Sequence, residues 1–187
     1  MKPEISTEQQ LLIEEEIIRK TKNNPEAFRV IYERYYKPIF LFVLHRVGQK
    51  EQSADITSQV FLKALVKIDR FTFRGLPFSS WLYRIAANEC NNYFRENKRS
   101  RVVVLEDYHV ENLYDDMFGE NFQEEMRTRL PGILQRLKPE ELQIVELRYL
   151  EGRPFREVAE ILNITETYAK VRTYRILEKM KKLFVGK

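Results

Sequence analysis

The chain has 187 residues, with 32 Lys and Arg against 28 Asp and Glu, 43% hydrophobic residues, 12% aromatic residues and one Cys. Such a length suits one domain or two small ones, and such a composition excludes a fibrous, a low-complexity and a wholly disordered chain. One Cys cannot form an internal disulfide, and His45, His109 and Cys90 do not stand at ligand spacing. We therefore expect neither a metal site nor any other cofactor.

The first residues, Met1-Lys2-Pro3-Glu4, lead into charged residues and not into the apolar core of a secretion signal. The longest apolar stretch, residues 38–44, is far shorter than the roughly 20 residues that span a bilayer. These features predict a cytoplasmic protein without membrane insertion.

Apolar residues recur at helical spacing through the first hundred residues, and no sustained period-two alternation occurs there. The recurring positions are Phe28, Ile31, Tyr32 and Tyr35, then Ile56, Val60 and Ala64 with Phe61, Leu65 and Ile68, and then Trp81, Leu82, Ile85 and Ala86. A helix cap at Ser79 or Ser80 is expected after the breakers Gly75 and Pro77. The pattern predicts an all-α fold.

Polar side chains form a stripe on the second of these helices, at residues 55, 58, 59 and 63. Such a stripe is either a solvated face or a surface that binds a partner helix. Taken alone, the sequence favours the solvated face.

From residue 71 to residue 101, aromatic residues alternate with Arg, Asn and Lys. This mixture suits binding of unpaired nucleic acid, because rings stack on bases while cations hold the backbone. The alternative is that the rings belong to the core, which we favour for Trp81 and Phe94. Cys90 is expected to be a buried small side chain and not a redox switch.

The charge pattern along the chain is basic, acidic and basic. Residues 91–101 carry a net charge of +3, residues 102–130 carry −6 and residues 153–187 carry +5. The acidic stretch loses helical periodicity and contains Asp115, Asp116 and Gly119, so it is predicted to be a flexible linker over residues 102–127. The alternative is that it mimics nucleic acid and shields the basic surfaces.

The C-terminal residues predict a helix-turn-helix. A helix from Glu140 ends at Gly152, Pro154 opens a second helix to Leu162, and a turn over residues 163–165 leads to a basic helix from Glu166 to Met180. Ala159 allows close helix packing, and Asn163 tolerates a left-handed backbone. In this motif the second helix enters the major groove of DNA. A plain helical hairpin with a solvated basic face is the alternative.

Several blocks together resemble one family, the extracytoplasmic-function (ECF) type of RNA polymerase sigma factors within the sigma-70 family. The matching blocks are residues 27–35 with 39–47, Asp55-Ile56-Thr57-Ser58-Gln59-Val60-Phe61, residues 78–88, Tyr93-Phe94-Arg95 with Lys98-Arg99, and residues 137–180. The resemblance implies an N-terminal extension (1–24), region two (25–101), a linker (102–127) and region four (128–187), which is the helix-turn-helix.

The resemblance also implies partners and a role for each surface. Core RNA polymerase would be bound through its β′ clamp and β flap, promoter DNA through the −10 and −35 elements, and an anti-sigma factor would regulate the chain, which would not be an enzyme. The residues carried over by position are Asp55, Ser58, Gln59 and Lys63 for the polymerase clamp, Arg74, Phe78, Ser79, Arg84, Asn88, Asn92, Arg95, Lys98 and Arg99 for the −10 element, and Lys170, Arg172, Thr173, Tyr174 and Arg175 for the −35 element.

The chain departs from the usual family pattern at Ser58, where Gln is frequent, and at Ala169 and Val171, which replace Val and Ser. No −35 sequence is therefore predicted. Two other functions are alternatives to the sigma factor. A helix-turn-helix regulator with a sensing or dimerising N-terminal domain leaves the polar stripe and residues 81–99 without a role. A hydrolase using Asp115 and Asp116 lacks a supporting base or metal.

Overall fold

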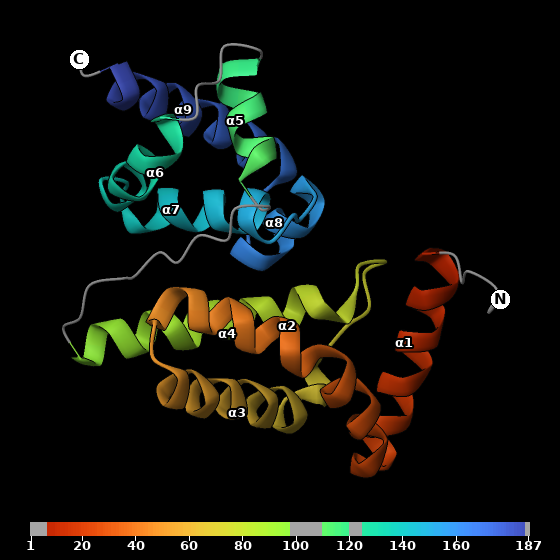
Figure 1. Ribbon diagram of the computed structural model, residues 1–187. Coiled ribbons are helices and arrows are strands. Elements are labelled where there is room, and N and C mark those ends of the chain that lie inside the picture. Colours follow the sequence, from red (N-terminus) through yellow and green to blue (C-terminus); the bar gives the residue numbers. More distant parts are fainter. Residues whose placement is uncertain (1–6, 98–109, 120–124, 186–187) are drawn as a thin grey trace, which may run out of the picture. The chain divides into compact units, whose positions relative to one another are not determined.

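The computed structural model describes residues 7–97, 110–119 and 125–185, and every long element in these ranges is a helix. The chain divides into two compact units, residues 1–101 and residues 102–187 (Figure 1). The prediction of an all-α fold of two small helical domains is confirmed.

The first unit is a bundle of three long helices with a fourth helix against it. The bundle helices are α2 (Arg29–Val47), α3 (Lys50–Val66) and α4 (Phe78–Asn97), and each packs on the other two. The helix α1 (Thr7–Asn23) contacts α2 and two short 3₁₀ turns, η1 (Pro25–Phe28) and η2 (Ile68–Arg70). The core of this unit includes the fully buried residues Ile31, Ile39, Phe42, Val43, Val60, Ala64, Leu82 and Ala86.

Aromatic rings join α2 to α3. The Phe61 ring lies 6.3 Å from the Phe28 ring and 4.9 Å from the Tyr32 ring, both in edge-to-face geometry. The helices are connected by Gly48, whose φ of 73° is left-handed and whose N–H donates to the Leu44 carbonyl at 2.8 Å. Glycine adopts this backbone without steric cost, so α2 ends there and the chain reverses into α3.

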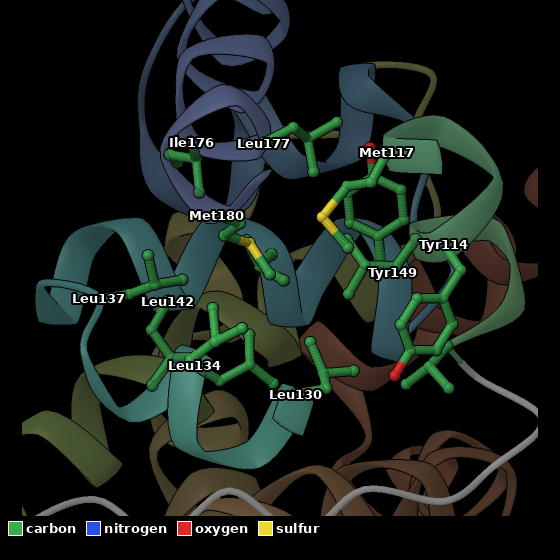
Figure 2. Packing of buried hydrophobic residues seen from close by; sticks show 14 of the residues in the cluster. Tyr114, Met117, Leu130, Leu134, Leu137, Leu142, Tyr149, Ile176, Leu177 and Met180 are labelled. Carbon is green, nitrogen blue, oxygen red and sulfur yellow. The ribbon is translucent and has the colours of Figure 1, made fainter. Parts of the chain in front are cut away.

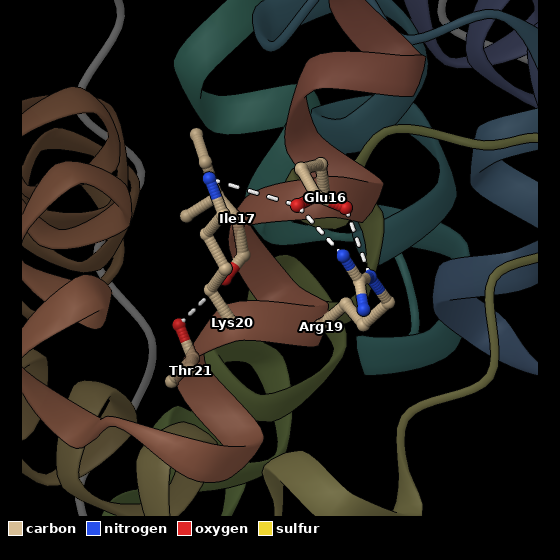
Figure 3. A network of polar contacts seen from close by, with 5 residues as sticks. All are labelled: Glu16, Ile17, Arg19, Lys20 and Thr21. Atoms are coloured by element: carbon tan, nitrogen blue, oxygen red, sulfur yellow. Dashed lines mark hydrogen bonds and ion pairs between the residues drawn. The ribbon is translucent and has the colours of Figure 1, made fainter.

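One face of α1 is packed and the other carries ion pairs. Ile18 and Thr21 are buried, whereas Glu16 pairs on the surface with Arg19 at 2.8 Å and with Lys20 at 3.6 Å (Figure 3). The hydrogen bond from Arg19 holds the pKa of the Glu16 carboxyl below its ordinary value. Within the N-terminal extension expected from the sequence, residues 7–23 thus form an amphipathic helix of the first unit.

The second unit surrounds one apolar cluster. Its helices are α5 (Glu111–Phe118), α6 (Glu125–Gln135), α7 (Pro139–Val145) with the π-helical turn η5 (Glu146–Leu150), α8 (Phe155–Leu162) and α9 (Glu166–Val185). Helices α5, α6, α7 and α8 all contact α9. Figure 2 shows how Leu130, Leu134 and Leu142 face Leu177 and Met180 across this core.

The structure differs from the sequence expectation within the acidic stretch 102–127. Residues 111–118 form α5, with Val110, Leu113, Tyr114 and Met117 buried against the second unit. The Phe118 ring lies edge-on to Phe184, with centroids 5.1 Å apart. The four buried apolar residues stand at positions i, i+3, i+4 and i+7, a spacing that predicts an amphipathic helix. The acidic residues between them obscured this spacing in the sequence.

The helix-turn-helix expected from the sequence is present. Pro154 is the N-cap of α8, so α8 begins at Phe155, and Ala159 is buried in the motif. Asn163 ends α8 with φ 55° and ψ 48°, which is the left-handed backbone expected for this position. The Ile164 N–H donates to the Ala159 carbonyl at 3.0 Å and closes the turn.

The backbone of Asn163 leads to a stability prediction. Asn163→Gly should change the free energy of unfolding by less than about 0.5 kcal/mol, whereas Asn163→Val should lower it by about 1–2 kcal/mol, because a β-branched side chain is strained at positive φ. Urea unfolding followed by circular dichroism measures the loss, and hydrogen exchange assigns it to α8 and α9. Equal stability of the two variants would contradict this interpretation.

Candidate functional site

Most of the polar stripe on α3 lines a surface groove that α3 shares with α4. Asp55, Gln59 and Lys63 stand on one wall of this groove and Glu89 and Asn92 on the other, around a volume of about 340 Å³. The Lys63 ammonium and the Glu89 carboxylate form an ion pair of 2.5 Å between the two helices. The groove therefore unites three residues assigned by the resemblance to polymerase with Asn92, which it assigns to the −10 element.

The same face of α3 also exposes apolar side chains that the sequence analysis missed. Leu62 is 55% exposed and Val66 is 72% exposed, and both continue the stripe at helical spacing. Ser58 is exposed beside them, outside the groove lining, and its hydroxyl donates to the Ala54 carbonyl at 2.9 Å. Polar residues bordered by exposed Leu and Val suit a helical protein partner.

A second stripe follows α4, where Arg84, Asn88, Asn91 and Arg95 recur at helical spacing with their side chains exposed or half-buried. The Arg95 guanidinium donates to the Asn92 Oδ1 at 3.0 Å, so the stripe reaches the edge of the groove. Guanidinium and amide groups can bind both the backbone and the base edges of nucleic acid.

A loop of residues 71–77 precedes α4 and rests on an aromatic cluster. The Phe71 and Phe78 rings lie 4.9 Å apart, and each lies 5.3 Å from the Trp81 ring. Phe71 and Trp81 are half-buried, and Arg74 is exposed in the loop. Trp81 is thus partly core and partly available for stacking.

The structure corrects two of the residues assigned to the −10 element. Phe78 is 0% exposed and Ser79 is 3% exposed, because both lie in the first turn of α4, whose start packs into the core. The helix also begins at Phe78, before the Ser79 or Ser80 cap expected from the sequence. Phe78 and Ser79 therefore pack beneath the loop, and their side chains are not exposed at its surface. Lys98 and Arg99 lie outside the described residues.

The helix α9 presents a mixed cationic and aromatic face. Thr165 accepts a hydrogen bond at its hydroxyl from the Tyr168 N–H at 3.2 Å, which fixes the first turn. Lys170, Tyr174 and Arg175 are exposed as expected, with Lys170 2.7 Å from Glu166. Tyr168 is 53% exposed and Val171 is 43% exposed, and neither was predicted at this face. Both border a hollow of about 340 Å³ near the start of α9.

Thr173 also requires correction as a candidate −35 residue. Its side chain is 1% exposed, and its hydroxyl donates to the Ala169 carbonyl at 2.8 Å within the helix. Residues 169, 173 and 176 form the buried face of α9, so Thr173 packs inside the second unit.

Glu141 ties α9 to the start of α7. Its carboxylate accepts the Lys138 N–H at 3.0 Å and the Lys179 ammonium at 2.6 Å, with the Arg172 guanidinium 3.9 Å away. Burial raises the pKa of the Glu141 carboxyl, but the hydrogen bonds from Lys179 and Lys138 outweigh it, and the pKa lies below its ordinary value. Arg172 is therefore partly engaged within the protein.

Two other candidate residues from the sequence, Asp116 and Cys90, take part in the packing of the protein. The Asp116 carboxylate accepts the Tyr149 hydroxyl at 2.8 Å, and burial together with this hydrogen bond raises the pKa of Tyr149. Cys90 is fully buried.

Within residues 7–97, 110–119 and 125–185, no cluster of His, Cys, Asp and Glu could hold a metal ion. None of the helices in these ranges is both long and apolar enough to cross a bilayer.

Comparison with protein families assigns each unit. The family described as Sigma-70 region 2 matches residues 31–100, and the family described as Sigma-70, region 4 matches residues 133–182. The first match covers the bundle with the groove, and the second runs from the last three residues of α6 through the larger part of α9.

Individual relatives agree with these matches. The chain is 30% identical to the ECF RNA polymerase sigma-E factor of Escherichia coli, over 90% of each chain. It is also 30% identical to the ECF RNA polymerase sigma factor BldN of Streptomyces coelicolor, covering 88% of this chain but 63% of that relative. The solved structure of CnrH in complex with the cytosolic domain of CnrY matches with a TM-score of 0.61 and 17% identity, over 92% of this chain and 97% of that chain, and shows the shared fold.

The Glu141 cluster predicts a pH-dependent stability. Because the folded pKa lies below the unfolded value of about 4.3, the carboxylate contributes fully at neutral pH, and the contribution is lost as the pH falls through the folded pKa. Glu141→Gln should lower the free energy of unfolding by about 1–3 kcal/mol at pH 7. The difference from wild type should shrink below about pH 4.

Urea unfolding at several pH values measures this effect. The matched control is Glu140→Gln, the same change at the neighbouring exposed residue, which should leave stability nearly unchanged at every pH. A Glu141→Gln deficit that stayed constant down to pH 3 would contradict the role of the ionised carboxylate.

Proposed function

Because the chain belongs to the ECF RNA polymerase sigma factors, we propose that its exposed surfaces divide the work of an alternative sigma factor, which directs promoter recognition and transcription initiation. The first unit binds core polymerase and the −10 element, and the second unit binds the −35 element. The observation that carries this proposal is that each unit, beside its own packed core, exposes a distinct polar surface on the helices that match regions 2 and 4. The chain acts in the cytoplasm, where bacterial polymerase meets the chromosome.

Core polymerase binds on the α3 face of the first unit. Asp55, Gln59 and Lys63 offer polar contacts in the groove, while Leu62 and Val66 supply apolar area beside it. A helical partner such as the β′ clamp coiled coil suits this surface, because the anchors recur at i, i+3, i+4 and i+7. The polymerase β flap binds the second unit.

The −10 element binds at the loop before α4 and along the α4 stripe. Arg74 in the loop and Arg84, Asn88, Asn92 and Arg95 on the helix hold the strand, and the half-buried Trp81 ring offers a stacking surface. Capturing an unstacked base offsets the few kcal/mol that unpairing and unstacking cost. Lys98 and Arg99 remain proposed contacts to the same element.

The −35 element binds the exposed face of α9 as duplex DNA. Lys170 and Arg175 contact phosphates or guanine edges, Tyr174 lies between them, and Arg172 contributes while it also pairs with Glu141. Major-groove contacts supply register, and two linked sites bind more tightly together than either one alone. No covalent chemistry is required of this chain.

An anti-sigma factor is the proposed regulatory partner. It covers the α3 face and thereby competes with polymerase for Leu62, Val66 and the groove. CnrH, which shares the fold of this chain, was solved in complex with the cytosolic domain of CnrY. That complex supports the proposal that a protein of this fold is bound by a regulatory partner.

Transcription in vitro tests the proposed function directly. Core RNA polymerase is incubated with sheared genomic DNA, with and without the full chain. Defined start sites that appear only with the chain are expected, and their aligned upstream sequences supply the promoter elements. A chain that binds duplex DNA but neither binds core polymerase nor starts transcripts would instead be a helix-turn-helix regulator.

The salt dependence of promoter binding tests α9. Lys170→Ala and Arg175→Ala should each weaken binding of the mapped −35 duplex and reduce the slope of log affinity against log salt by about 0.9 per lost phosphate contact. Lys182→Ala is the matched control, since Lys182 is exposed on the same helix, about 18 Å along the axis from Lys170 and about 10 Å from Arg175. Unchanged slopes for the first two variants would remove them from the interface.

A further inference from the structure

Helix α1 carries a buried carboxylate. Glu14 is 4% exposed, and α1 precedes the residues 31–100 that match Sigma-70 region 2. A buried carboxylate is costly unless several donors satisfy it, so its contacts indicate what it holds in place.

The Glu14 carboxylate joins three helices. Its Oε1 accepts the Arg34 guanidinium at 3.0 Å and the Tyr35 hydroxyl, both from α2. Its Oε2 accepts the backbone N–H of Phe78 at 3.0 Å, at the first residue of α4. An anionic acceptor at a helix N-terminus is favourable, because it satisfies a free N–H and complements the helix dipole.

A second contact from α1 holds the other end of the same loop. The Lys22 ammonium donates to the Phe71 carbonyl at 3.4 Å. Phe71 and Phe78 are therefore both tied to α1, and their rings contact each other and Trp81. The interior of the loop, which includes Arg74, lies between two contacts to the same helix, α1.

We propose that Glu14 is a positioning residue for capture of the −10 element: it fixes the start of α4, and with Lys22 it holds the loop of residues 71–77 in the geometry that receives an unpaired base. This inference rests on the proposed function. It assigns a role in promoter opening to the N-terminal helix, whose contacts described above are to α2, to the start of α4 and to the loop.

The decisive comparison is Glu14→Gln against Glu16→Gln, both in the full chain assembled with core polymerase. Gln keeps the shape of Glu14, but its amide nitrogen cannot accept a hydrogen bond, so the Phe78 and Arg34 contacts are no longer both satisfied. Glu16 lies on the exposed face of the same helix with Arg19 and Lys20 (Figure 3), which makes it a matched control for the loss of charge.

Three properties are measured for each variant: affinity for core polymerase, affinity for the −35 duplex, and the rate of opening at a mapped promoter. Glu14→Gln should slow opening about tenfold, the effect of losing one charged hydrogen bond, with both affinities within about twofold of wild type. Glu16→Gln should match wild type in all three. Trp81, the single Trp, provides a spectroscopic signature, because its fluorescence response to a single-stranded −10 oligonucleotide should weaken in Glu14→Gln alone.

Wild-type opening by a folded Glu14→Gln variant would overturn the inference, and so would an equal loss of opening and of both affinities, which marks general destabilisation. If circular dichroism shows that Glu14→Gln does not fold, Lys22→Met replaces it, because Lys22 is exposed. That variant should open promoters about threefold more slowly, and an unchanged rate would refute the positioning role. Failure of the wild-type chain to open any promoter would instead refute the proposed function itself, and the inference with it.

Discussion

Small size is the constraint on which the rest of this structure depends. Each unit has about 100 residues or fewer, and a domain of that size buries only about two-thirds of the surface that its unfolded chain exposes. Every long helix must therefore give one face to a core and leave the opposite face to solvent. In α3, α4 and α9 the solvent faces carry the polar and apolar side chains that are proposed to bind partners, so the cores and the binding surfaces share the same helices.

In both units a buried, hydrogen-bonded carboxylate supplements the apolar core. Glu14 in the first unit and Glu141 in the second are buried carboxylates, and each accepts a backbone N–H at the start of a helix: Glu14 from Phe78 of α4, and Glu141 from Lys138, the N-cap of its own helix α7. Each also pairs with a cation from a different helix, Arg34 or Lys179. A carboxylate with directional partners fixes the angle and register of a helix more narrowly than apolar packing does, which suits helices that are proposed to present side chains to DNA.

Much of the fold could be predicted from the sequence because it depends on local signals. Periodic apolar residues predicted the helices, and Asn163 predicted the left-handed turn before α9. The helix α5 was missed because its four buried apolar residues stand among acidic ones, and composition outweighed spacing. The ties made by Glu14 and Glu141 were not predictable, because their partners are up to 64 residues away in the chain.

The residues of the candidate site were also predicted only in part. Residues on exposed stripes, such as Asn88 and Lys170, lie where the resemblance expects them at the surface, whereas Phe78, Ser79 and Thr173 are buried. A family motif records which positions matter, but it does not distinguish a side chain that contacts DNA from one that supports the contacting residue. The exposed Leu62, Val66 and Tyr168 were missed for the complementary reason, since apolar residues on a polar face are easily attributed to a core.

The chemistry of the proposed surfaces follows from what each one binds. Duplex DNA presents a dense row of phosphates, and the cations and rings exposed on α9 suit the major-groove contact proposed for this helix. A melted strand presents the faces and edges of its bases, so the α4 surface combines amides, guanidinium groups and the ring of Trp81. Cations alone would bind duplex and single strand with little distinction, and the duplex is the more stable form. Opening therefore requires a surface that gains binding free energy only after a base leaves the stack, which is the role proposed for the loop that Glu14 holds in place.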